Sequence, residues 1–232
     1  MTAAQHQPSS QGIHARAAQS HGTTWFLLAA LRRPREIGAI APTGRALAAQ
    51  AADLINTARA PRTVVELGPG SGTITRAIQS RLPPDSTFCT VERNTAMAAY
   101  LTQAWPALNV IHGDAADLPR LLHNAAIGPV DLIISALPWS LIPPPAQEQI
   151  LSGIAHVLHP HGTFATIITV PVRPLPAARQ LRRRLTATFG DVTRSPTVWS
   201  NVPPAHLWIC REPLSSDPAN TETPSPAARP TP

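Results

Sequence analysis

A glycine-rich turn is the part of this chain best suited to bind a ligand. The apolar run at residues 63–67 is a predicted strand, and it leads into a Gly-x-Gly-x-Gly turn at Gly68, Gly70 and Gly72. Glycine has no Cβ, so the turn can be tight and a ligand can approach the backbone closely. A helix is predicted to open at Thr73, where free amides face that ligand. The turn therefore predicts a nucleotide-like partner.

Three acidic side chains are predicted at strand ends beside this turn. Glu66 ends the first strand, Glu92 ends the second, and Asp114 follows the third. The turn alone also suits a dinucleotide, whose fingerprint has a ribose-binding acid about 20 residues further on. Glu92 follows Gly72 by 20 residues, and its carboxylate can accept hydrogen bonds from ribose hydroxyls. Asp114, one strand further, can accept from an adenine amino group.

The fourth predicted strand, residues 131–135, ends in Ser-Ala-Leu-Pro-Trp at residues 135–139. A small residue, a proline and an aromatic ring would form a rim beside the reacting group. Two further predicted strands, 197–200 and 206–211, follow one another without a helix between them. Together with the glycine turn and the three strand-end acids, these features resemble the class I S-adenosyl-methionine-dependent methyltransferases. The resemblance implies S-adenosyl-methionine as the cofactor, bound by Glu66, Gly68, Gly70, Gly72, Thr73, Glu92, Arg93, Asp114, Ala115 and Ser135.

The resemblance also implies how the acceptor is handled. Methyl transfer from a sulfonium is an in-line displacement of an activated leaving group, so the protein mainly supplies orientation. The backbone carbonyls of Ser135 and Leu137 are expected to orient the acceptor, and His206 and Glu36 are candidate bases. The residues expected to contact the acceptor are Trp25, Thr43, Trp139 and Trp199. The tryptophans also suit ordinary core or edge positions, and no metal is expected.

Alternating helices and strands have to position these residues. The predicted helices cover 25–33, 43–57, 73–81, 96–105, 118–125, 146–158 and 177–189. The predicted strands cover 63–67, 87–92, 109–112, 131–135, 163–170, 197–200 and 206–211. Strands separated by helices imply a parallel sheet covered on both faces. The predicted fold is α/β and Rossmann-like: a mostly parallel seven-stranded sheet with an antiparallel C-terminal edge and an N-terminal helical extension.

Composition divides the chain into three parts. Residues 1–22 are rich in polar residues and residues 213–232 in proline, so both are predicted to be disordered. The methyltransferase domain is expected at 23–212, with a helical acceptor or lid region at 23–60. All 19 basic residues are arginine, and the net charge of +6 suits nucleic acid, an anionic membrane surface or an anionic substrate. No signal peptide or membrane span is evident, so a cytoplasmic location is predicted.

Much of residues 24–211 resembles a narrower group, the bacterial phospholipid N-methyltransferases. The segments that carry this resemblance are 26–34, 37–48, 134–139, 175–185 and 198–205. It implies a phosphatidylethanolamine-type amine as the acceptor, with peripheral contact at an anionic membrane surface. Ribosomal RNA adenine dimethyltransferases share the glycine turn, but they carry Asn where this chain has Ser135. No nucleic acid partner is therefore expected.

Two further hypotheses remain at the level of sequence. One is a soluble methyltransferase of specialised metabolism that acts on a small amine or an indole-bearing product, on nitrogen or carbon. His206, after Pro203, Pro204 and Ala205, favours it, because the lipid enzymes are expected to have an apolar residue there. The other is a binding protein with a decayed site, which the intact acids at three strand ends disfavour.

Overall fold

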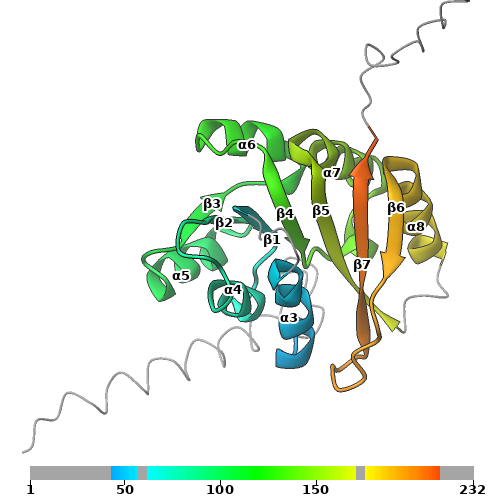
Figure 1. The fold of residues 1–232 in the computed structure, drawn as a ribbon, viewed down its shortest axis with the longest axis horizontal. Helices are drawn as coiled ribbons and strands as arrows, with labels where there is room; N and C mark the ends of the chain where they lie inside the picture. The colour runs from blue at the N-terminus through cyan, green and yellow to red at the C-terminus, as the bar shows by residue number, and fades with distance from the viewer. Residues whose placement is uncertain (1–42, 57–61, 171–175, 215–232) are drawn as a thin grey trace, which may run out of the picture.

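A seven-stranded sheet with helices on both faces forms the described part of this computed structural model, residues 43–56, 62–170 and 176–214 (Figure 1). The strands are β1 (Thr63–Leu67), β2 (Thr87–Glu92), β3 (Asn109–His112), β4 (Val130–Ser135), β5 (Leu158–Thr169), β6 (Phe189–Arg194) and β7 (Ala205–Pro213). The helices are α3 (Arg45–Ala52), α4 (Thr73–Gln79), α5 (Thr95–Ala104), α6 (Leu118–Asn124), α7 (Pro144–Val157) and α8 (Pro176–Thr188). Short 3₁₀ turns are η1 (Asp53–Asn56), η2 (Ala115–Asp117) and η3 (Trp139–Leu141). The strand order β3-β2-β1-β4-β5-β7-β6, with β7 antiparallel, confirms the predicted fold class.

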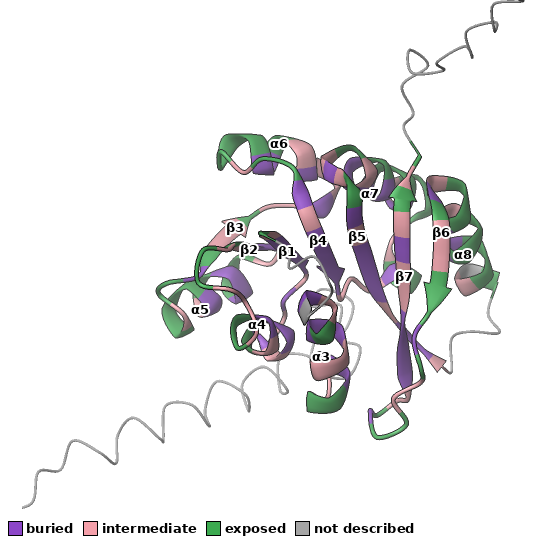
Figure 2. Ribbon diagram, viewed as in Figure 1, coloured by how far each residue is buried: buried purple, intermediate pink, exposed green. Residues whose placement is uncertain are grey.

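Both faces of the sheet are buried against helices (Figure 2). Val65 and Leu67 of β1 belong to one apolar cluster with α6, α7 and α8, whereas Val64 belongs to the other, with α3 and α4. Strand β1 is therefore apolar on both sides, as expected for a parallel strand covered by helices. Because side chains alternate along a strand, Glu66 points to the same face as Val64, toward α4.

The carboxyl ends of the parallel strands meet at one edge of the sheet. Leu67 at the end of β1 pairs with Ser135 at the end of β4. Glu92 at the end of β2 pairs with His112 at the end of β3. The first residue of β7, Ala205, lies at this edge as well, because β7 runs antiparallel to β5. Ligands of open α/β sheets bind at this edge, so the fold brings the predicted site residues to the right place.

The predicted strand at 197–200 is wrong. This segment makes one isolated bridge, from Val198 to Ala205, and the edge strand is β6, where the sequence predicts the end of a helix and a loop. Gly190 and Asp191 are poor strand formers, and pairing with β7 overrides their local preference. The helix predicted over 177–189 accordingly ends at Thr188.

Other boundaries differ by a few residues. The helix predicted over 43–57 is α3 followed by η1, and β5 begins at Leu158, before the predicted 163. Pro213, predicted to open the disordered tail, ends β7. The predicted helix at 25–33 and the predicted disordered segments at 1–22 and from 215 onward lie outside the described residues. Within the described ranges, no helix is long and apolar enough to cross a membrane.

Candidate functional site

The turn between β1 and α4 depends on glycine conformation. Gly68, Gly70 and Gly72 have φ angles of 71°, 53° and 78°, in the left-handed region that favours glycine. The Gly68 amide donates to the Val91 carbonyl at 3.0 Å, and the Gly72 amide donates to the Pro69 carbonyl at 2.9 Å. Backbone hydrogen bonds to β2 and within the turn therefore fix its shape.

The three glycines have different surroundings. A Cβ on Gly72 would overlap the ring of Trp105, which closes that side of the turn. A Cβ on Gly68 would lie 3.2 Å from the side chain of Leu137, across the sheet edge. A Cβ on Gly70 would meet no described atom within 4 Å. The open side of the turn is thus at Gly70, where a ligand can approach the backbone.

Glu66 is a fully buried carboxyl group behind this turn. Its Oε2 accepts a 2.6 Å hydrogen bond from the hydroxyl of Thr75, two residues after α4 begins at Thr73. Its Oε1 has no hydrogen-bond partner among the described residues. Burial raises the pKa of Glu66 to about 8, opposed by the Thr75 hydrogen bond and reinforced by the nearby Glu92 carboxylate. Buried polar atoms normally have partners, so the free oxygen indicates a ligand group that donates to it.

Glu92 lies beside the same turn at the end of β2. Its Oε1 accepts from the amide of Asn94 at 2.8 Å. Burial raises the pKa of Glu92, while hydrogen bonds from the amides of Asn94, Gly70 and Arg93 lower it. The interaction with Gly70 shows that this carboxylate lies next to the glycine turn.

Asp114 follows β3 and caps η2. Its Oδ1 accepts from the amide of Ala116 at 3.0 Å, and its Oδ2 lies 3.5 Å from Nη1 of Arg93. Ala115 is buried beneath this cap, while the Asp114 side chain remains partly exposed. The acid predicted to bind adenine therefore has a fixed position and keeps access to solvent.

Buried hydrogen bonds hold the rim after β4. The Trp139 indole donates to the Thr166 hydroxyl at 2.7 Å, and that hydroxyl donates to the Ser135 carbonyl at 3.3 Å. The Trp139 amide donates to the Leu137 carbonyl at 2.9 Å. These hydrogen bonds fix the positions of the two carbonyls that are predicted to orient the acceptor.

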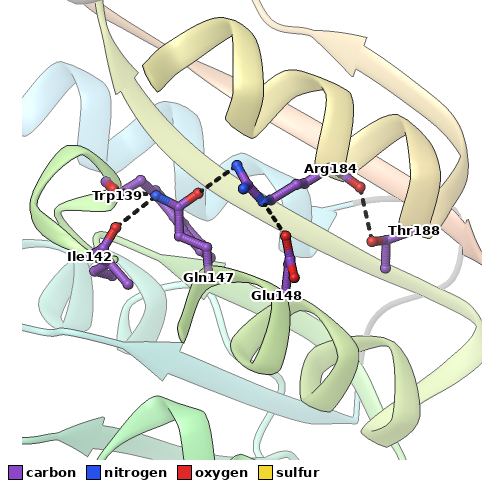
Figure 3. Close-up of polar contacts among 6 residues, drawn as sticks. All are labelled: Trp139, Ile142, Gln147, Glu148, Arg184 and Thr188. Atoms are coloured by element: carbon purple, nitrogen blue, oxygen red, sulfur yellow. Dashed lines mark hydrogen bonds and ion pairs between the residues drawn. The ribbon is translucent and has the colours of Figure 1, made fainter. Parts of the chain in front are cut away.

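Gln147 of α7 holds the main chain of the same rim (Figure 3). Its Nε2 donates to the carbonyls of Trp139 at 2.8 Å and Ile142 at 2.9 Å, and its Oε1 lies 3.5 Å from Nη1 of Arg184. Arg184 also pairs with Glu148 at 3.1 Å, so this network ties α8 to α7 and to the rim. Gln147 could not be recognised from the sequence, because a glutamine near a helix start carries no signal for burial.

Replacing Gln147 with leucine is expected to lower the free energy of unfolding by about 2 kcal/mol. The carbonyls of Trp139 and Ile142 would lose their shared donor in a nearly closed environment. Denaturant titration with an unchanged m-value measures the loss. Gln149 is the matched control on the same helix, because it also donates to a carbonyl, that of Ala116 at 3.2 Å, but at an exposed site. Gln149→Leu should change stability by less than about 0.5 kcal/mol, and equal losses would contradict the role of Gln147.

The predicted acceptor residues do not gather in one place. Trp139 and His206 are buried in the interior, on the rim and on β7. Thr43 precedes α3 and is partly buried, whereas Trp199 is exposed in the loop between β6 and β7. Trp25 and Glu36 lie outside the described residues. The strand-end acids and the glycine turn therefore form the coherent part of the site.

Comparisons with known sequences point to one chemistry. Residues 64–162, which include the turn, the acids and the rim, match a family model described as a methyltransferase domain. The chain is 31% identical over 153 residues to ornithine lipid N-methyltransferase of Singulisphaera acidiphila, a match that covers 65% of this chain and 76% of that protein. It is 36% identical over 81 residues to ribosomal RNA small subunit methyltransferase A of Chlorobium luteolum, covering 35% of this chain and 28% of that protein.

Solved structures share the fold. An O-methyltransferase from Bacillus cereus in complex with SAH superposes with a TM-score of 0.61 at 12% identity, covering 84% of this chain and 91% of that one. TrmN from Thermus thermophilus gives a TM-score of 0.56 at 23% identity, covering 71% of this chain and 48% of that one. TomG from Streptomyces achromogenes, in complex with SAM, gives a TM-score of 0.54 at 18% identity, covering 75% of this chain and 82% of that one.

Proposed function

Because the chain belongs to the S-adenosyl-methionine-dependent methyltransferases, we propose that it transfers a methyl group from this cofactor to the amine of a lipid head group. The observation that carries the choice of acceptor is the 31% identity, over 153 residues, to a lipid N-methyltransferase. The net charge of +6 is compatible with an anionic lipid surface.

The residues at the sheet edge fit S-adenosyl-methionine. The free Oε1 of Glu66 offers a buried acceptor for the ammonium of the methionine part. The open side of Gly70 leaves room for a ligand against the backbone. Glu92 and Asp114, on neighbouring strands, would hold the ribose hydroxyls and the adenine amino group. When bound, the cofactor supplies a methyl group on a positively charged sulfur that is already activated as a leaving group.

The chain itself contributes orientation. Thr166 and Gln147 fix the rim, and the rim places Leu137 opposite the glycine turn. The acceptor would bind between the rim and the turn as a neutral amine, after the head-group ammonium has released one proton to water, with its remaining hydrogens directed to the carbonyls of Ser135 and Leu137. That arrangement would aim the nitrogen lone pair at the cofactor. Within the rim, Trp139 would shape this pocket from its inner side, since the ring is buried.

Incubating the full chain with methyl-labelled S-adenosyl-methionine tests the acceptor. We expect label in the amine of a lipid, with ornithine lipid and phosphatidylethanolamine assayed separately in detergent. A panel of soluble amines and indoles is assayed in parallel. Label in a soluble acceptor and in neither lipid would contradict the lipid assignment and support the specialised-metabolism alternative.

A further inference from the structure

The loop between β6 and β7, residues 195–204, exposes two large apolar side chains beside the site. Trp199 and Val202 are 73% and 79% exposed. Strand β7 begins at the edge where β4 ends, so the loop lies at the same edge as the glycine turn and the rim (Figure 1). In the sheet β7 is two strands from β4, a separation of about 10 Å.

A buried asparagine holds this loop in shape. Asn201 accepts at Oδ1 from the Gly44 amide at 2.8 Å and donates from Nδ2 to the Pro203 carbonyl at 2.6 Å. The Val198 amide donates to the Ala205 carbonyl at 2.7 Å. The loop therefore holds the Asn201 side chain inward while Trp199 and Val202 remain exposed.

The charge around the loop is positive. Arg194 precedes the loop, and Arg45 begins α3 next to Gly44; both are exposed. Neither residues 43–52 nor residues 194–205 contain an acidic residue. Arginine is attracted to anionic lipid head groups, and tryptophan favours the interface between head groups and acyl chains. Exposed apolar side chains flanked by arginines therefore fit the surface of a lipid bilayer better than they fit bulk water.

We propose that this loop, flanked by Arg45 and Arg194, docks on the interface of a lipid bilayer. Trp199 and Val202 enter the head-group region, and the edge that carries the site then faces the membrane. The proposal rests on the lipid acceptor proposed above, because a head-group amine has to be reached at a bilayer surface. A contact of two apolar side chains gives shallow, reversible binding.

Co-sedimentation of the full chain with vesicles of phosphatidylcholine and phosphatidylglycerol tests the surface. The double variant Trp199→Ser with Val202→Ser is expected to lower the partition coefficient about tenfold. Leu214→Ser is the matched control, because Leu214 is 51% exposed but lies past the far end of β7. Arg45→Gln with Arg194→Gln is expected to remove the preference for anionic vesicles. Brominated lipids should quench wild-type tryptophan emission more than that of Trp199→Phe.

Equal partition of the wild type and the double variant would overturn the proposal, as would an equal loss in Leu214→Ser. So would a dimer that forms without vesicles and that the double variant dissociates, because a second copy would then cover the loop. These vesicles offer no primary amine and the assay contains no cofactor. Vesicle binding that depends on Trp199 therefore stands even if lipid methylation fails. If the chain methylates a detergent-dispersed lipid but its vesicle binding does not depend on the loop, the docking surface is wrong and the lipid acceptor stands.

Discussion

Replacing Glu66 with glutamine is expected to weaken S-adenosyl-methionine binding by about a hundredfold or more. Glu66 is fully buried, and its Oε1 has no partner among the described residues. Glutamine keeps the size of the side chain and an oxygen for the Thr75 hydroxyl, but it removes the negative charge that the cofactor ammonium needs. Calorimetric titration of the full chain measures the affinity. An unchanged dissociation constant would show that the ammonium binds elsewhere.

The raised pKa of Glu66 adds a pH dependence to the same experiment. With a pKa of about 8, the group is protonated in the free protein at neutral pH, and binding a cation requires it to release that proton. The affinity is therefore expected to rise with pH by up to about tenfold per unit below pH 8. Glu66→Gln should lack this rise. Calorimetry in buffers of different ionisation enthalpy measures the released proton directly.

The free energy of unfolding of the ligand-free protein, by contrast, should fall as the pH rises. The pKa of Glu66 rises from an ordinary value of 4.5 to about 8 on folding, so between these values the folded state holds a proton that the unfolded state has lost. The free energy of unfolding therefore falls by up to about 1.4 kcal/mol per pH unit across this window, relative to Glu66→Gln. The contribution of Glu66 is full below pH 4.5 and is lost by about pH 8. At pH 8 the variant should be more stable than the wild type and bind less cofactor. If Glu66→Gln were less stable than the wild type at pH 8 and also bound less cofactor, the substitution would have damaged the fold.

The parts of the site that sequence could predict are local in the chain. Glu66, the turn glycines and Thr73 lie within one short segment, and their positions follow from a strand that ends in a glycine-rich turn. Glu92 and Asp114 could be found because each directly follows a predicted strand, and parallel strands end at one edge. Placing these acids at one end of the sheet required only that their strands be parallel, which the alternation of helices and strands predicts.

The supports of the site depend on contacts between distant segments. Thr166 reaches the Ser135 carbonyl across 31 positions, and Arg184 lies 37 positions from Gln147. No local pattern marks such partners, because a threonine in a strand and a glutamine in a helix are common in any environment. The edge strand β6 has no local signal for the same reason, since its pairing with β7 and not its composition makes it a strand. Whether residues 189–194 form a strand therefore depends on long-range pairing and not on their local propensity.

Replacing Gly72 with alanine is expected to lower the free energy of unfolding by about 3 kcal/mol or more. The backbone has a φ of 78°, which an L side chain rarely adopts, and the new Cβ would overlap the Trp105 ring. That ring packs edge-on against Tyr100 at 6.2 Å and lies 5.8 Å from the Arg76 guanidinium, so neighbours on both sides restrict its movement. For a chain of this size the melting temperature should fall by roughly 6–12 °C. Thermal unfolding followed by circular dichroism measures the shift.

Gly70→Ala separates the role of conformation from that of packing. Gly70 is also left-handed, with a φ of 53°, but its Cβ would meet no described atom within 4 Å. We expect Gly70→Ala to lower the free energy of unfolding by the conformational cost alone, about 1–2 kcal/mol. Its methyl group would also narrow the open side of the turn and weaken cofactor binding. Adding Trp105→Ala to Gly72→Ala should recover stability relative to the sum of the single changes, because the overlap disappears. If Gly70→Ala instead binds the cofactor normally, the ligand does not approach the turn from its open side, and the turn serves the fold through Gly72 and Trp105 alone.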